Sequence, residues 1–224
     1  MTPAEWATCC STFVDKYSRG QWGEDIRRNG CLGWTWKPHP TWPAFGYMTR
    51  QVTLRYRNST TEPLVESELP EEPDLEGAVD WNQVSHTRSR RELNSTQYVV
   101  YSPSFQVPAF YFVVSDGDGR VLSIEETVKT TIFRPGVVPE AAVHTTHIDR
   151  PGEQAEDASV FPLLSQGDHP VLQTPCLYVH PCETQTAVKE LVHARQSETG
   201  DTMGHEQWLE MWFLVLGGVL DLGE

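Results

Sequence analysis

Gln97-Tyr-Val-Val-Tyr101 and Ala109-Phe-Tyr-Phe-Val-Val-Ser115 are the two stretches that decide the fold. Valine, tyrosine and phenylalanine fit a pleated, buried surface, so both stretches are predicted to be strands. Pro103 and Pro108 mark the segment between them, because proline interrupts the hydrogen bonding of a central strand. We therefore expect two buried strands that form the heart of a sheet.

The N-terminal third adds one helix and two further strands. Between Ala4 and about Arg19, apolar residues recur every three or four positions, which predicts an amphipathic helix with one buried face. Runs of strand-forming residues predict a short strand over Gly33–Lys37 and a longer one over Gly46–Tyr56. The longer strand is expected to leave an exposed edge, to which a strand of a partner can add or which is merely solvated.

The C-terminal part is predicted to be largely helical. Helical periodicity over Thr184 to about Gln196, and again over His205–Leu216, predicts two helices that each pack one apolar face on the core. Between the central strands and these helices we expect a short strand over Val121–Ile124 and a short helix over Glu125–Ile132. The stretch from Arg134 to Gly167 is rich in proline and is expected to be mostly irregular.

One acidic segment, at about residues 57–95, interrupts the predicted strands. Its carboxylates lie among prolines, with few large apolar residues, and this composition is typical of a mobile insertion rather than a core element. A chain of 224 residues suits one domain with insertions. We therefore expect a single domain over residues 1–224 that carries this insertion.

Charge and hydropathy exclude several classes of function. The net charge is −14, from 17 basic and 31 acidic residues, and such a surface repels phosphate backbones and anionic lipids. Nucleic-acid binding is therefore not expected, and the longest apolar run, Met211–Leu220, is far shorter than the roughly 20 residues that span a bilayer. The N-terminus has no signal-peptide pattern, and five cysteines are too few for a disulfide framework. We expect a cytoplasmic protein with protein partners.

The stretch Cys176-Leu-Tyr-Val-His180-Pro181-Cys182-Glu-Thr184 carries the strongest signal of chemistry. A strand is predicted to end at Pro181, with Cys182 on the loop immediately before a helix N-terminus. Unpaired N–H groups and the helix dipole favour a thiolate at such a position, and the thiolate is the nucleophile of acyl transfer. The alternative is an inert structural thiol, because free cysteine often packs as a small hydrophobe.

Two further interpretations of this stretch stay open. Cys176, His180 and Cys182 share one face of an extended strand, as metal ligands would. A cysteine hydrolase would need a basic histidine near the sulfur, and His180, His169 and His193 all qualify by count.

A calcium site is not predicted. Asp116-Gly-Asp-Gly119 begins with the spacing of a calcium-binding loop, but no carboxylate follows at the required distance. A hairpin turn is expected there. We predict neither a metal nor a cofactor for this chain.

The ordered motifs of the second half resemble a known family. His169-Pro-Val-Leu172, Tyr178-Val-His-Pro-Cys-Glu-Thr184 and the upstream Tyr98-Val-Val-Tyr-Ser-Pro-Ser-Phe-Gln-Val-Pro108 with Tyr111-Phe112 are similar to motifs of the autophagy ubiquitin-like-conjugating enzymes. The specific pair of signals is His-Pro-Cys-x-Thr with Gln-Val-Pro upstream. The resemblance extends from about Tyr98 to the C-terminus, and over the first third it is only an agreement in the order of helix and strands.

This resemblance implies both a fold and an activity. The fold is of the ubiquitin-conjugating type, an α+β domain with an antiparallel sheet, an N-terminal helix and two C-terminal helices. The activity is a transferase step of autophagosome assembly, in which Cys182 accepts a ubiquitin-like modifier as a thioester from an activating enzyme and passes it to a lysine of an acceptor. In the family the modifier is autophagy-related protein twelve, the activating enzyme is protein seven and the acceptor is protein five.

Other residues receive roles from the same resemblance. Ubiquitin-conjugating enzymes in general use an asparagine of a His-Pro-Asn element, where this chain has His169-Pro-Val. The expected oxyanion donors are therefore His180 and the backbone N–H groups of Glu183 and Thr184. Tyr101 is expected either to border the catalytic groove or to be buried in the sheet, and His169 either to cap its loop or to order the active site.

A non-catalytic interaction module of the same fold is the rival hypothesis. In that case Cys182 would be a relic, and a sheet edge would bind the partner. The retained cysteine favours the enzyme.

Overall fold

The computed structural model describes residues 1–19, 30–57, 92–137, 164–200 and 203–223. Within them the elements follow in the order α1 (Pro3–Ser18), β1 (Thr35–Lys37), the 3₁₀ helix η1 (Pro43–Phe45), β2 (Tyr47–Leu54), β3 (Leu93–Ser102), β4 (Val107–Ser115), α3 (Ile124–Thr127), β5 (Leu164–Asp168), β6 (Pro175–Val179), α4 (Pro181–Thr199) and α5 (His205–Leu216). This confirms the predicted α+β class, with an N-terminal helix, an antiparallel sheet and two C-terminal helices.

The strands form one antiparallel sheet in the order β1-β2-β3-β4-β6-β5. β3 and β4 lie at its centre and pair from Asn94 opposite Ser115 to Ser102 opposite Val107. The predicted heart of the sheet is therefore confirmed. β6 pairs with β4, so the strand that leads into α4 lies beside this central pair.

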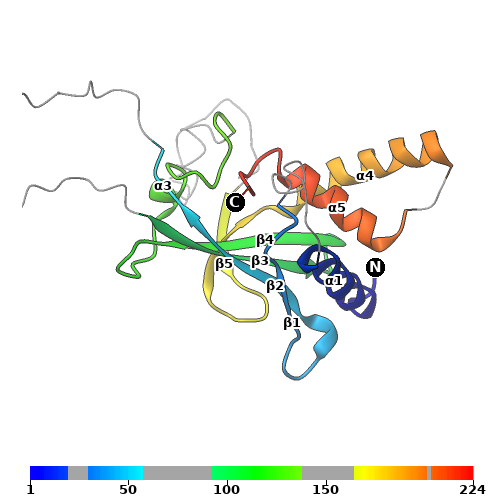
Figure 1. The fold of residues 1–224 in the computed structure, drawn as a ribbon, viewed down its shortest axis with the longest axis horizontal. Helices are drawn as coiled ribbons and strands as arrows, with labels where there is room; N and C mark the ends of the chain where they lie inside the picture. Colours follow the sequence, from blue (N-terminus) through cyan, green and yellow to red (C-terminus); the bar gives the residue numbers. More distant parts are fainter. Residues whose placement is uncertain (20–29, 58–91, 138–163, 201–202, 224) are drawn as a thin grey trace, which may run out of the picture.

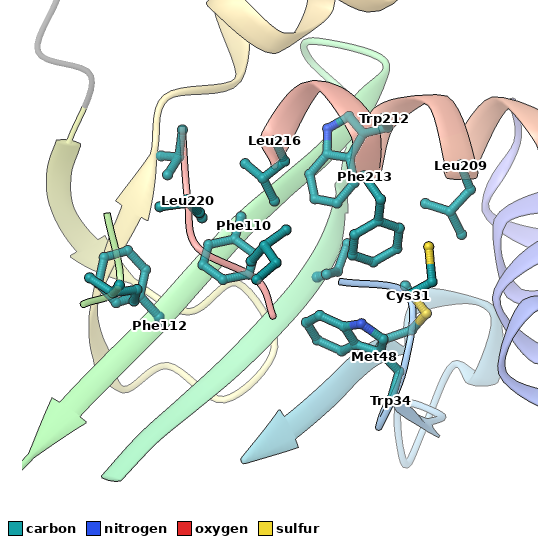
Figure 2. Close-up of a cluster of buried hydrophobic side chains, with 14 of the residues drawn as sticks. Cys31, Trp34, Met48, Phe110, Phe112, Leu209, Trp212, Phe213, Leu216 and Leu220 are labelled. Atoms are coloured by element: carbon teal, nitrogen blue, oxygen red, sulfur yellow. The ribbon is translucent and has the colours of Figure 1, made fainter. Parts of the chain in front are cut away.

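Helices cover one face of the sheet, and α4 runs beside α5 and extends away from the strands (Figure 1). Residues alternate between the two faces of a strand, so Phe110 and Phe112 point to the helices and are buried. Figure 2 shows Trp212, Phe213 and Leu216 of α5 in the same cluster. Full burial of one such side chain contributes roughly 1.5–3 kcal/mol, which makes this cluster the main source of stability.

The N-terminal helix is fixed at both ends. The hydroxyl of Thr2 accepts a hydrogen bond from the backbone N–H of Glu5, and the Glu5 carboxylate accepts one from the N–H of Thr2. This reciprocal cap and Pro3 at the first helical position are strong start signals. Near the other end, the ammonium group of Lys16 lies 2.7 Å from a carboxylate oxygen of Glu210 on α5.

A buried arginine joins distant parts of the chain. Arg50 on β2 donates from Nε to the side-chain oxygen of Gln97 (2.8 Å), from Nη1 to the carbonyl of Leu32 (3.0 Å) and from Nη2 to the carbonyl of Leu222 (3.1 Å). Its guanidinium also lies 4.6 Å from the ring centre of Trp34. A buried cation requires hydrogen-bond acceptors in place of water. The segment around Leu32 and the C-terminal segment are thereby held to the sheet.

The boundaries of the predicted insertion need correction. The backbone N–H of Arg57 donates to the carbonyl of Lys129, and Leu93–Ser95 already belong to β3. The start of β3 was missed because Asn94 and Ser95 look polar, although Leu93 and Ser95 point into the core. Residues 58–91, which hold the acidic stretch, lie outside the described part of the chain.

The region between the central strands and the C-terminal helices also differs from expectation. Val121 forms only an isolated bridge to Ser115 instead of a strand over Val121–Ile124, and the short helix is Ile124–Thr127. Leu164–Asp168 forms β5 within a stretch that was expected to be irregular. Its polar sequence carries little strand signal because it is an edge strand. Asp116–Gly119 forms the expected tight turn, in which the N–H of Gly119 donates to the carbonyl of Asp116.

The outer edge of β2 is only partly open. β1 pairs with Tyr47–Thr49, which is a pairing that the sequence did not predict. Within the described residues, no strand lies against the outer edge of Arg50–Leu54. Partner-strand addition at β2 is therefore limited to this second half. None of the described helices is both long enough and apolar enough to cross a membrane.

Candidate active site

The candidate nucleophile lies inside a helix rather than before one. β6 ends at Val179, His180 is the N-cap residue of α4 with an extended backbone (φ −63°, ψ 125°), and Pro181 is the first helical residue. The residue before a proline is biased to such an extended backbone, and proline is well suited to the first helical position. The expectation that Cys182 precedes the helix is therefore wrong, because Pro181 begins the helix instead of only ending the strand.

A histidine and a thiol meet at this helix start. Nδ1 of His180 lies 2.8 Å from Sγ of Cys182 and accepts a hydrogen bond from the backbone N–H of Cys182 at 3.3 Å. The two residues are half-buried. The sequence predicted that both would contribute to the site, and the structure brings them together.

Cys182 differs from the other four cysteines. Cys9, Cys10, Cys31 and Cys176 are buried, and burial raises the pKa of Cys9 and of Cys31 to about 12. These four are thiols at neutral pH. Cys182 alone combines partial exposure with a position at a helix N-terminus, where the dipole favours a negative sulfur.

The same turn occurs at three places in the described part of the chain. At His39-Pro-Thr-Trp42 and at His169-Pro-Val-Leu172, Nδ1 of the histidine accepts the backbone N–H groups two and three residues later, at 3.0–3.1 Å. His180-Pro-Cys182 repeats the first of these bonds. The proline between them has no N–H, so the next donors converge on the ring nitrogen. We call this arrangement the His-Pro turn.

The His-Pro turn assigns the proton on the ring. An Nδ1 that accepts backbone N–H groups carries no proton, so the neutral imidazole holds its proton on Nε2. In this tautomer Nδ1 of His180 is a hydrogen-bond acceptor for the thiol of Cys182. The proton acceptor nearest to the sulfur in this arrangement is therefore Nδ1 of His180.

His169 lies in a cluster of tyrosine rings. Its ring is fully buried against the rings of Tyr47, Tyr98 and Tyr111, at centroid distances of 4.9, 4.7 and 5.7 Å. Burial lowers its pKa to about 4. Its Nε2 has no hydrogen-bond partner, and the rings of the three tyrosines surround the imidazole.

The contacts of His169 also run along its own loop. Its backbone N–H donates to the carbonyl of Thr174, and its carbonyl accepts from the N–H of Gln173. Together with the His-Pro turn, these bonds close the loop between β5 and β6. The structure therefore places His169 as the cap of this loop.

Tyr101 is bound to the N-terminal helix. Its hydroxyl donates to the carbonyl of Met1 at 2.8 Å, and its ring stacks on Trp6 at 5.6 Å. Its side chain is half-buried. Of the two alternatives for Tyr101, these contacts fit a packing role in the sheet better than a place at the border of the catalytic groove.

Three residues around the pair received no role from the sequence. The rings of Phe105 and Tyr178 lie 5.4 and 6.4 Å from the ring of His180. The side-chain amide of Gln185 donates to the carbonyl of Phe105 at 2.5 Å. Phe105 belongs to the turn between β3 and β4, so its approach to α4 depends on the tertiary fold.

Several observations bear on the open alternatives for this site. Within the described residues, no cluster of three or more His, Cys, Asp or Glu side chains is arranged to hold a metal ion. Cys176 lies on the sheet beside His169 and Thr174. His193 is eleven residues after Cys182 on the same helix, which separates them by about 16 Å along the axis. Of the three histidines considered as a base, only His180 reaches the sulfur.

Comparison with known proteins identifies the family of the chain. The family model described as "Autophagocytosis associated protein, active-site domain" matches residues 5–224. The ubiquitin-like-conjugating enzyme ATG10 of Arabidopsis thaliana is 28% identical over 231 residues, which cover 99% of this chain and 92% of that protein. ATG10 of Homo sapiens is 24% identical over 208 residues, which cover 89% and 84%. ATG10 of Dictyostelium discoideum is 25% identical over 118 residues, which cover 52% and 44%.

These matches confirm the resemblance that the motifs indicated. Within the family, the continuation Cys182-Glu-Thr184 and the short chain favour autophagy-related protein ten, and all three relatives carry that name. The chain therefore belongs to the autophagocytosis-associated protein, active-site domain family and is, with its ATG10 relatives, a ubiquitin-like-conjugating enzyme.

Proposed function

We propose that Cys182 carries a ubiquitin-like modifier as a thioester and passes it to a lysine of an acceptor protein. The observation that supports this most is the 2.8 Å approach of His180 Nδ1 to Cys182 Sγ at a half-exposed helix start. By the family resemblance, the modifier is autophagy-related protein twelve, the activating enzyme is protein seven and the acceptor is protein five. We propose that the reaction takes place in the cytoplasm.

The first step is a transfer between two thiols. Sγ of Cys182 attacks the carbonyl carbon of the modifier's C-terminal thioester on the activating enzyme, and its proton passes to Nδ1 of His180. The C–S bond to the activating enzyme breaks, and the departing thiolate takes up a proton. One thioester is exchanged for another, so the step is close to balanced in energy and is driven by the ATP used upstream.

The second step is aminolysis. The ε-amino group of the acceptor lysine attacks the thioester carbon, the C–S bond breaks and an isopeptide bond forms. Cys182 leaves as a thiolate and recovers a proton as the amine loses one. The helix N-terminus stabilises this leaving thiolate.

One backbone donor remains for the oxyanion of either intermediate. In an α-helix the N–H of the fourth residue after the cap donates to the carbonyl of the cap residue, and this engages the N–H of Thr184 with His180. The N–H of Cys182 donates to Nδ1. Of the two backbone groups predicted from sequence, we therefore assign the role to the N–H of Glu183. Loss of one such donor typically costs about 10²-fold to 10³-fold in rate.

The decisive experiment follows the thioester directly. The protein is incubated with activating enzyme, modifier and ATP and run on a nonreducing gel. We expect a band shifted by one modifier that disappears with thiol reductant and is absent for Cys182→Ala. Cys182→Ser should give a shifted band that resists the reductant, because an oxyester replaces the thioester.

Failure of this experiment has one meaning. If the activating enzyme is charged with modifier and wild-type protein gives no shift, the conjugating mechanism is wrong. The non-catalytic interaction module then takes its place, provided that wild type and Cys182→Ala still bind the partners equally.

A further inference from the structure

We propose that Gln185 is a positioning residue of the active site, which holds the turn between β3 and β4 so that Phe105 fixes the ring of His180 beside Cys182. This inference rests on the proposed function for its effect on conjugation. Its effect on thiol reactivity is independent of that function.

The first contact joins the helix to the turn. Gln185 lies three residues after Cys182, so both side chains leave the same side of α4. Its amide Nε2 donates to the carbonyl oxygen of Phe105 at 2.5 Å, across 80 residues of sequence. The contact is part-buried, which limits competition from water.

The turn needs such a contact because of its backbone. Gln106 has a φ of 58°, in the left-handed region that residues with a side chain rarely occupy. Its N–H donates to the carbonyl of Ser102 at 2.8 Å, and this bond closes the turn. The carbonyl bound by Gln185 belongs to the peptide unit immediately before Gln106. The hydrogen bond from α4 therefore fixes the orientation of the peptide that enters the strained residue.

The second contact joins the turn to the histidine. The ring of Phe105 meets the ring of His180 edge-on, with centroids 5.4 Å apart and an interplanar angle of 79°. Aromatic pairs prefer this perpendicular arrangement over a face-to-face one. Tyr178 lies 6.4 Å from the same imidazole. These rings restrict the imidazole to the orientation in which Nδ1 faces the sulfur of Cys182.

The contacts form a closed circuit. Cys182 and Gln185 are on one helix, Gln185 holds Phe105, Phe105 packs on His180, and His180 contacts Cys182. Removing the amide of Gln185 leaves the helix and the core cluster intact. The substitution removes the contact that holds the turn, so the ring of Phe105 no longer fixes the orientation of His180. A small displacement of a catalytic group is costly, so we expect about a tenfold loss of loading rate.

The test replaces the amide with an apolar group of similar length, Gln185→Met. The matched control is Gln196→Met, which makes the same change on an exposed residue of the same helix. The first readout is the rate at which iodoacetamide alkylates Cys182, followed by mass spectrometry from pH 6 to pH 10. The other cysteines are buried and react slowly in the folded protein.

We expect a pH-dependent difference in alkylation. At pH 7 Gln185→Met should react about threefold more slowly than wild type, because His180 no longer assists loss of the thiol proton. At about pH 10 the two rates should converge, since the thiol then ionises without assistance. Phe105→Leu should show the same defect, and the double variant should be no worse than either single one, because both act through His180.

The outcomes separate this proposal from the proposed function. An unchanged alkylation profile for Gln185→Met overturns the positioning role, even if wild type loads modifier. A changed profile in a protein that never loads modifier supports positioning and refutes the conjugating mechanism. Equal defects for Gln185→Met and Gln196→Met would also overturn the proposal, because the effect would then come from α4 as a whole.

Discussion

Replacement of His169 by phenylalanine tests how the loop between β5 and β6 is held. Phenylalanine keeps an aromatic ring among the tyrosines but lacks Nδ1, which accepts the backbone N–H groups of Val171 (3.1 Å) and Leu172 (3.0 Å). The bonds are part-buried, so each loss costs about 1 kcal/mol. At pH 7.5 we expect His169→Phe to be about 2 kcal/mol less stable than wild type.

The difference should shrink as the pH falls. The pKa of His169 is lowered to about 4, below its ordinary value of 6.5 in an unfolded chain. Between these values the unfolded state binds more protons than the folded state, so wild-type stability falls as pH falls, by at most about 1.4 kcal/mol per pH unit. His169→Phe has no such group. The two proteins should therefore be about equally stable near pH 5, and at pH 4.5 the variant should be slightly the more stable, whereas other titrating groups affect both alike.

Urea denaturation at several pH values between 4.5 and 7.5 measures this difference. His39→Phe is the control, because His39 forms the same two bonds in a more exposed loop and should cost less. A stability difference between wild type and His169→Phe that stays constant over this range would refute the reasoning. Such a result would show that folding does not favour the neutral form of the His169 ring over the protonated form.

Three further predictions concern the supports of the sheet, each measured by chemical denaturation. Arg50→Met should lower stability by about 3 kcal/mol, because the buried carbonyls of Leu32 and Leu222 lose their donor, and a loss below about 1 kcal/mol would contradict the network. Leu222→Ala should cost about 2–5 kcal/mol because the side chain is fully buried, and a neutral effect would mean that the C-terminal segment does not pack as described. Lys16→Met should cost less than about 1 kcal/mol and less still in high salt, since its pair with Glu210 is partly exposed, and a salt-independent loss would point to packing instead.

Periodic patterns of apolar residues predicted the helices and strands that bury one regular face. The apolar stripe of α1 and the aromatic run of β4 repeat with the period of one helix face or one buried strand, so residue order alone identifies them. β5 and the start of β3 have no such pattern. Leu164–Asp168 is an edge strand of mostly polar residues. Its pairing with β6 depends on the tertiary fold, which the local sequence does not show.

One part of the candidate site was predictable from local sequence, and the other part was not. Cys182 and His180 were identified because the His-Pro-Cys motif is contiguous and ends at a predicted helix. The helical position of Cys182 was also open to prediction, since proline commonly begins helices. Phe105 and Gln185 were not predictable, because their contact joins residues 80 positions apart and neither carries a reactive group. The hydrogen-bond partners of Arg50 were not predictable either, because they lie far from Arg50 in the sequence.

The recurrence of the His-Pro turn separates what the backbone provides from what the cysteine adds. His39 and His169 hold the same ring geometry with no sulfur, two residues before Thr41 and Val171 respectively. The fold thus maintains the imidazole placement for loop closure alone, at two sites with no assigned chemistry. A cysteine at the second position after such a histidine therefore has its backbone N–H held at Nδ1 and its sulfur within reach of the same ring nitrogen, as at Cys182, so a backbone turn that closes loops elsewhere also sets the distance between an imidazole and a thiol.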